Sequence, residues 1–222
     1  MTVSIRWLGH SGFQIRSEAS VVYVDYYRPS ELAKRVAEPT EKATLVLVTH
    51  SHDDHCHSEA IARIIGPDTV IAGPEDCAKK TGLRFTAMRP GESLFVKNIS
   101  VRAVHAYNVK RFRSPGKPFH PKGFGVGYVI TIDDKSIYHA GDTDLIPEMS
   151  ELKDIDVALL PVGDTYTMDN AEAVEAVRTI NPRVAIPMHT WDKGVDVFKS
   201  GVSGIKGVNL VVLREGQEYT IV

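Results

Sequence analysis

The sequence has few cysteines, no long apolar run and no large excess of either charge. Its two cysteines, Cys56 and Cys77, are too few to staple a chain of 222 residues, so we expect both thiols to be reduced. A membrane-spanning helix needs about 20 apolar residues, and no stretch approaches that length. The first residues enter a strand pattern instead of a leader pattern. The sequence therefore predicts a cytoplasmic protein without a membrane partner.

The charges are nearly balanced, with 26 basic and 28 acidic residues and a net charge of −2. This balance gives no general reason to expect a nucleic acid or an anionic membrane as partner, so any basic surface must be local. A hydrophobic content of 43% in a chain of this length is enough to bury a full core. We expect one domain over residues 1–222.

Residues 49–55 concentrate three histidines and two aspartates directly after a continuous β-branched run, which is typical of a buried strand. Such a loop lies at the carboxyl end of its strand, where α/β proteins place their chemistry. His50 and His52 are two residues apart and can turn to one side to hold a metal ion. Asp54 and His55 offer an oxygen and an imidazole for another ion. The alternative is a solvated His-rich turn. Further metal-binding residues elsewhere in the chain would decide between the two.

Three later strand-like runs also end in a residue that can bind a metal ion: His105, Asp142 and His189. Taken singly, each has another explanation, since Asp142 could cap a helix and the two histidines could be hydrogen-bonded core residues. His10, in the first turn, could likewise have a structural or a supporting role. The recurrence of these residues at strand ends favours a metal site.

Strand-like and helix-like runs alternate in two halves of similar plan. Helices are predicted at residues 29–37, 58–65, 74–81 and 170–180. The segment that follows residue 192 is rich in Gly, Ser and Lys and predicts a mobile connection before the last two strands. Trp191 is equally compatible with a pocket wall and with the core.

These features together resemble the metallo-β-lactamase superfamily, in particular the metal-dependent hydrolase branch that includes ascorbate-6-phosphate lactonase. The resemblance covers most of the chain, and the matching stretches are residues 7–11, 49–55, 139–143, 159–163 with 167–168, and 187–189. It implies an α/β (α+β) fold, a four-layer αββα sandwich of two mixed β-sheets flanked by helices. The site would lie at one edge of the two sheets.

The family pattern implies two groups of metal ligands and a bridge: His50, His52 and His105 for one ion, Asp54, His55 and His189 for the other, and Asp142 between them. We expect two divalent ions, with Zn²⁺ first and Mn²⁺, Fe²⁺ or Ni²⁺ as alternatives. Asp164 stands where we would expect glycine, which puts the backbone shape of that loop in question.

Two divalent ions about 3.5–4 Å apart can share a hydroxide and polarise the bond to be cut. Asp54 would orient that hydroxide and accept its proton. The predicted activity is hydrolysis of an ester, lactone or phosphoester. A di-iron redox protein on the same fold is an alternative, weakened because the sequence offers no flavin-binding domain. A phosphodiesterase or nuclease is another, for which a larger basic face would be typical.

The segment 108–123 is too long and polar for a simple connection and carries several cations and no carboxylate. A solvated, flexible turn is one explanation. The other is a lid that recognises a small anionic substrate through Arg111, Arg113 and Lys117. His120 would then enter the pocket on closure and donate a proton to a substrate oxygen. Assembly into a ring or dimer stays open.

Overall fold

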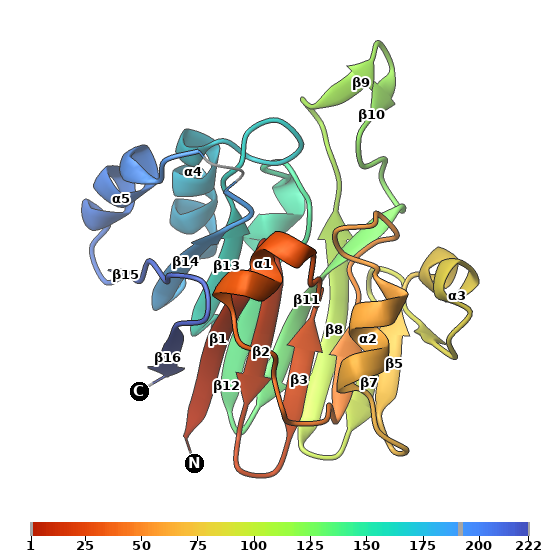
Figure 1. Cartoon of the computed structure of the whole chain (residues 1–222). Helices are drawn as coiled ribbons and strands as arrows, with labels where there is room; N and C mark the ends of the chain where they lie inside the picture. The colour runs from red at the N-terminus through yellow and green to blue at the C-terminus, as the bar shows by residue number, and fades with distance from the viewer. Residues whose placement is uncertain (1, 191–192, 222) are drawn as a thin grey trace.

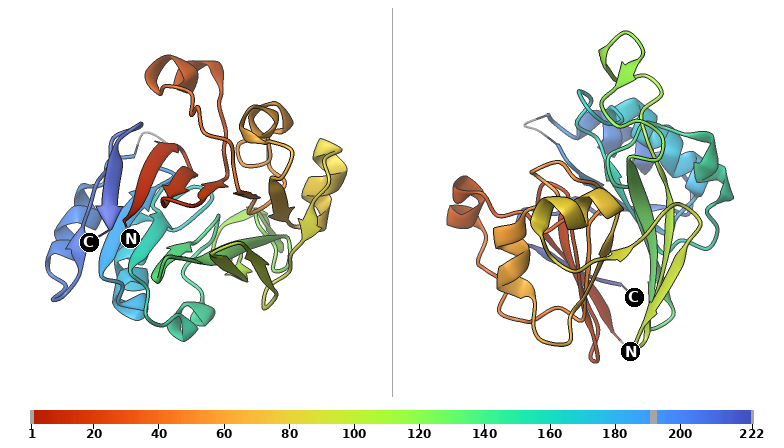
Figure 2. Two further views of the ribbon diagram at one scale, coloured as in Figure 1. Left: turned by 90° about the horizontal axis from the view of Figure 1, so that it is seen from below. Right: turned by 90° about the vertical axis from the view of Figure 1, so that its right-hand side faces the viewer.

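Two seven-stranded mixed sheets face each other, and helices cover their outer surfaces (Figures 1 and 2). The computed structural model describes residues 2–190 and 193–221. This arrangement confirms the predicted αββα sandwich of mixed sheets. No helix in the described part of the chain is long and apolar enough to cross a membrane.

The first sheet has the order β16-β1-β2-β3-β4-β5-β6. It is antiparallel from β16 through β1 and β2 to β3, and from β3 onward its strands pair in parallel. Its strands are β1 (Val3–Gly9), β2 (Gly12–Arg16), β3 (Val21–Val24), β4 (Leu45–Leu47), β5 (Val70–Gly73), β6 (Thr86–Ala87) and β16 (Glu218–Ile221).

The second sheet has the order β15-β14-β13-β12-β11-β8-β7. It is antiparallel from β7 to β12 and parallel from β12 to β15. Its strands are β7 (Ser93–Val96), β8 (Ile99–Ala106), β11 (Gly125–Ile132), β12 (Lys135–His139), β13 (Val157–Pro161), β14 (Val184–Met188) and β15 (Asn209–Leu210).

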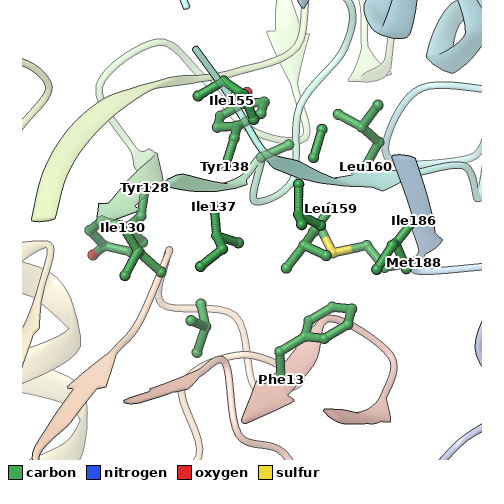
Figure 3. Close-up of a cluster of buried hydrophobic side chains, with 14 of the residues drawn as sticks. Phe13, Tyr128, Ile130, Ile137, Tyr138, Ile155, Leu159, Leu160, Ile186 and Met188 are labelled. Atoms are coloured by element: carbon green, nitrogen blue, oxygen red, sulfur yellow. The ribbon is translucent and has the colours of Figure 1, made fainter. Parts of the chain in front are cut away.

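The main core lies between the two sheets. In Figure 3, Phe13 of the first sheet lies opposite Ile137, Leu159 and Met188 of the second. These four side chains are fully buried. Burial of one such side chain stabilises the fold by about 1.5–3 kcal/mol, so this shared core holds the two sheets together.

Among the described residues, the helical segments that lie outside the sheets are α1 (Ser30–Arg35), α2 (Ser58–Ile64), α3 (Glu75–Thr81), η1 (Pro147–Glu151), α4 (Asn170–Ile180) and α5 (Asp196–Ser203). The first three cover the first sheet through a second apolar cluster that includes Leu32, Ile61 and Cys77. The α4 helix begins with a capping box between Asp169 and Glu172.

Two segments differ from the prediction. The connection expected after residue 192 contains the helix α5, whose Phe198 and Val202 are buried. The loop 108–123 contains a small hairpin of β9 (Phe112–Ser114) and β10 (Lys117–Pro118). Figure 1 shows this hairpin standing out from the sandwich, above the strand ends that carry the histidine-rich loop.

Candidate metal centre

The buried carboxylate of Asp25 organises the loop that follows β4. It accepts hydrogen bonds from the backbone N of Thr49 at 2.8 Å and from Thr49 Oγ1 at 2.6 Å. The Nδ1 of His55 lies 2.8 Å from Asp25 Oδ2, and a carboxylate can only accept, so Nδ1 donates. Thr49 Oγ1 has used its proton on Asp25 and therefore accepts from His50 Nδ1 at 3.0 Å. Both imidazoles consequently present Nε2 as the available ligand atom.

The first cluster consists of His50, His52 and His120. The Nδ1 of His52 lies 3.1 Å from His50 Nε2 and 3.2 Å from His120 Nε2. His50 and His120 are buried, and His52 is partly exposed. Three imidazole nitrogens within 4.8 Å of one another form a set that can hold a metal ion.

The second cluster consists of His10, Asp54, His55 and His189, whose candidate ligand atoms also lie within 4.8 Å of one another. His10 Nε2 and Asp54 Oδ2 are 3.1 Å apart. The carbonyl of His10 accepts a hydrogen bond from the backbone N of His189 at 3.1 Å, which joins the first turn to the end of β14. The structure therefore places His10 beside the site.

Asp142 lies between the two clusters. Its Oδ2 is 3.1 Å from His189 Nε2, 3.4 Å from His120 Nε2 and 4.0 Å from His50 Nε2. Its Oδ1 is 3.5 Å from His55 Nε2. A carboxylate in this position faces both groups of ligand atoms at once.

The nitrogen and oxygen atoms of the two clusters are suited to surround cations, and not to pack in a core without ions. His55 Nε2 and Asp142 Oδ1 are buried atoms without a hydrogen-bond partner among the described residues. Leaving such groups buried without a partner costs about 1–3 kcal/mol each, and a cation would satisfy both. Imidazole and carboxylate are ligands for zinc and for other first-row metals.

Burial and neighbouring charge shift the pKa values of the cluster. Burial lowers the pKa of His50 well below its usual value, and lowers the pKa values of His10 and His120 to about 4. For His55, burial also lowers the pKa, but the Asp142 and Asp25 carboxylates outweigh it and raise the pKa to about 10. Burial disfavours the charged form of Asp142, yet His189 and His55 hold its pKa well below the usual range. The site therefore favours the carboxylate form that metal binding requires.

Glycines allow the surrounding strands to approach the cluster. A Cβ at Gly125, the first residue of β11, would lie 3.0 Å from the Cβ of His50 and 3.2 Å from the carbonyl of Thr49. The absence of a side chain at Gly125 therefore allows β11 to pack closely against the histidine-rich loop at residues 49–55.

A cavity of about 330 Å³ opens onto both clusters. Its wall includes the guanidinium-bearing side chain of Arg113, whose Cζ lies 5.7 Å from the ring centroid of Phe119. The lining residues are His52, Asp54, Arg113, Phe119, His120, Asp142, Tyr166 and His189. A small substrate in this cavity would contact ligand residues, a cation and two aromatic rings.

The structure brings together six of the seven predicted metal ligands: His50, His52, Asp54, His55, Asp142 and His189. His105 lies outside the groups of potential ligands found in the described residues. It remains inside β8, paired with Val126, and its ring contacts Tyr107 with centroids 6.2 Å apart. His120, predicted to enter the site as a proton donor, already lies in the first cluster.

The three predicted anion-binding residues fall in different places. Arg113 lines the cavity. Arg111 is engaged by carboxylates of Asp144, Asp164, Asp169 and Glu172. Lys117 lies in β10 of the projecting hairpin and is not among the residues that line the cavity.

Two other expectations concern nearby loops. Asp164 has a φ of 71°, so it adopts the left-handed conformation that the glycine expected there would favour. Trp191 lies outside the described residues. Asp25, which orients His55, was visible in the sequence only as an acidic residue at a strand end.

The chain is similar in sequence and in fold to known proteins. Residues 4–189 match the model of a beta-lactamase superfamily domain. The chain is 33% identical to a UPF0173 metal-dependent hydrolase from Pelotomaculum thermopropionicum, over 99% of the chain and 100% of that relative. A solved structure from Parabacteroides distasonis is 33% identical with a TM-score of 0.85, and covers 97% of this chain and 94% of its own. Igni18, a metallo hydrolase from Ignicoccus hospitalis, is 25% identical with a TM-score of 0.77, over 99% and 98% of the two chains.

Proposed function

Because the chain belongs to the beta-lactamase superfamily and is a metal-dependent hydrolase, we propose that it cleaves an ester, lactone or phosphoester bond in a small anionic substrate, using two metal ions. The superfamily predicted from the sequence is confirmed, whereas the lactonase branch stays a prediction. The names of the full-length relatives favour hydrolysis over the di-iron redox alternative. The proposal depends mainly on the position of Asp142 between two clusters of ligand atoms.

The ligand set that we propose contains His120 in place of His105, which the sequence had predicted as a ligand. His50, His52 and His120 would hold one ion, and Asp54, His55 and His189 would hold the other, with Asp142 bridging them. The lowered pKa values of His50 and His120 favour the neutral imidazoles, and those of Asp54 and Asp142 favour the ionised carboxylates, that metal ligands need, and a cation would replace the proton that the neighbouring carboxylates hold on His55. Zn²⁺ is our first expectation because the set contains mainly imidazole and one or two carboxylate oxygens per ion.

When bound, the ions would lower the pKa of coordinated water and polarise the scissile bond. Asp54 would accept a proton from the attacking water, because its carboxylate lines the cavity and its lowered pKa keeps it ionised. Burial raises the pKa of Asp54, but the hydrogen bond from His10 and the charge of His55 together lower this pKa by more than burial raises it. His10 Nε2 would hold one Asp54 oxygen in a fixed direction and leave the other to accept a proton.

Arg113 supplies the basis for an anionic substrate. It is exposed and lines the same cavity as the ligand residues. A guanidinium there can bind a carboxylate or phosphate in a bidentate manner, at a position remote from the bond to be cut. The Phe119 and Tyr166 rings, whose centroids are 4.8 Å apart, would limit the width of the substrate.

The test begins with metal analysis of protein purified without a tag or chelator. Two ions per chain are expected in the native protein, and His120→Ala and His189→Ala should each lose about one. The metal found is then restored to metal-free protein for a screen of lactones, phosphodiesters and phosphomonoesters, with neutral esters of the same size as a matched set. Binding of no more than one ion, or loss of no ion in the His120 variant, would contradict the proposed centre.

A further inference from the structure

Asn108 and His120 are held together at the base of the β9–β10 hairpin. The backbone N of Asn108 donates to the carbonyl of His120 at 2.8 Å, and the backbone N of His120 donates to Asn108 Oδ1 at 2.8 Å. The same Oδ1 lies 2.9 Å from His120 Nδ1. Both side chains are buried, 5% and 3% exposed. His120 is therefore fixed through its backbone and its ring by one asparagine.

The orientation of the Asn108 amide follows from its other partners. Its Nδ2 donates to Asp144 Oδ1 at 3.1 Å and to the carbonyl of Tyr166 at 2.9 Å. Both partners are acceptors, so a flipped amide would place its oxygen against two oxygens. The carbonyl oxygen of Asn108 must therefore face His120. Because this oxygen can only accept a hydrogen bond, His120 Nδ1 must carry a proton and donate it. The lone pair of Nε2 then points toward His52 Nδ1 and Asp142 Oδ2.

Asp144 holds this amide in place, because its own position is fixed by many donors. It is fully buried and accepts from the backbone N atoms of Val109, Lys110 and Arg111 at 2.8, 2.7 and 3.2 Å. The guanidinium of Arg111 adds an ion pair at 3.2 Å. An asparagine bonded to such an anchor cannot turn its amide without breaking several buried contacts.

We propose that Asn108, oriented by Asp144, is the positioning residue for His120, and that it selects the tautomer whose Nε2 faces the metal cluster. The inference rests on the proposed function in one respect, that His120 is a metal ligand. Partners of this kind fix the ring orientation of a ligand histidine, and their loss typically lowers metal affinity by about 10–100-fold. The competing explanation is that Asn108 only closes the base of the hairpin.

The first test needs no change at position 108. Long-range ¹H–¹⁵N spectra of ¹⁵N-histidine protein, metal-free at neutral pH, report which nitrogen of each imidazole carries the proton, and His120→Gln assigns the signal. We expect a proton on Nδ1 of His120 and none on Nε2. A proton on Nε2, or a mixture of the two tautomers, would overturn the proposal even if the hairpin is intact.

The second test compares Asn108→Leu with Asn170→Leu by chelator competition with Zn²⁺. Asn170 is the matched control, because its side chain also joins separate segments. Its Nδ2 donates to the carbonyls of Val162 and Gly194, and its Oδ1 accepts from the backbone N of Phe198. None of these partners in the described part of the chain is a histidine. We expect Asn108→Leu to weaken one of the two zinc affinities by about 10–100-fold, and Asn170→Leu to leave both unchanged at a similar loss of thermal stability.

The possible results separate the two proposals. If His120→Ala keeps both ions, the ligand set fails. If His120→Ala loses an ion while Asn108→Leu binds zinc as the native protein does, the ligand set stands and the role of Asn108 is overturned. Equal losses of affinity in Asn108→Leu and Asn170→Leu would show a general effect of destabilisation and would also overturn it. If Asn108→Leu does not fold, the tautomer of the native protein decides.

Discussion

The Nδ1 of His55 lies 2.8 Å from Asp25 Oδ2, and neither side chain is exposed. The same carboxylate accepts two bonds from Thr49, so all three of its contacts are with donors. An amide in its place would turn an N–H toward one of those donors. This relationship joins the end of β3 to the histidine loop, and it predicts a measurable effect on metal binding.

We expect Asp25→Asn to lower zinc affinity by about 10–100-fold, because the ring of His55 loses the partner that orients it. The buried mismatch should also lower the free energy of unfolding by about 1–3 kcal/mol. Chelator competition and urea unfolding measure the two effects. Asp156→Asn is the matched control, since Asp156 accepts from Ser136 N at 2.8 Å and pairs with Arg183 at 3.4 Å, remote from the metal clusters. It should lose stability and keep its metal ions, and a similar loss of zinc in both variants would contradict the role of Asp25.

Asp142→Ala should bind neither ion tightly. The carboxylate faces both clusters, and its loss leaves two cations without the charge between them that offsets their repulsion. His189→Ala should be milder and lose mainly one ion. Metal analysis after gel filtration measures both, with circular dichroism as the check on folding. Two tightly bound ions in Asp142→Ala would exclude a bridging carboxylate.

The sequence predicts one helix to the residue. Helix α4 spans Asn170–Ile180 as expected, because its start is a local capping box and its end is Asn181 in the left-handed conformation before a proline. The helix α5 could not be predicted this way. Glycine and serine are weak helix formers, and the helix depends on packing. A Cβ at Gly201 would lie 2.5 Å from Val174 Cγ2, so this glycine lets α5 approach α4.

The predictions for the metal centre that differ from the structure do so for the same reason as α5, because they depend on tertiary contacts. His50 and His189 both lie close to Asp142, because all three follow strands whose carboxyl ends meet at one edge. His105 lies one residue before the end of β8, and the sheet register holds it. His120 reaches the first cluster through contacts with Asn108, and Arg111 is neutralised by carboxylates more than 30 residues away in sequence. Tertiary partners of this kind leave no local pattern in the sequence.

Arg111 should prove structural. Its side chain is 12% exposed and is paired with the fully buried Asp144, and it also contacts Asp164, Asp169 and Glu172. Removing one partner of a buried pair typically costs about 3–5 kcal/mol, so we expect a loss of that size for Arg111→Gln in urea unfolding. Arg63→Gln is the control, because its exposed pair with Glu38 should contribute only about 0–1 kcal/mol. Equal small losses in the two variants would show that the Arg111 cluster contributes little.

Glu172 predicts part of the acid sensitivity. Burial raises its pKa, but Lys110, the Asp169 backbone and Arg111 lower it more, so the folded-state pKa is below the unfolded value. A depressed carboxyl pKa gives stability that is present above the unfolded pKa, about 4.3, and is lost as the pH falls through the folded pKa. Glu172→Gln keeps a side chain that can complete the capping box. It should be less stable at pH 7 and lose less stability between pH 5 and pH 3. Parallel stability curves for both proteins would contradict this assignment.

Arg113 should determine the preference for anionic substrates. It lines the cavity beside the metal clusters and is exposed, whereas Lys117, on the same hairpin, does not line it. A hydrogen bond to a charged group contributes about 1.5–3 kcal/mol, so Arg113→Gln should raise KM for a phosphorylated or carboxylated substrate about 10-fold or more. Exposed charges are screened beyond about 8 Å at physiological ionic strength, so the variant should also show a weaker dependence of KM on salt. Metal content and hydrolysis of a neutral ester of equal size provide the comparison, and Lys117→Gln is the control for a cation on the hairpin. If Arg113→Gln impairs neutral and anionic substrates alike, or Lys117→Gln has the same effect, then the guanidinium does not recognise the substrate anion, and the charge of the substrate must be recognised elsewhere.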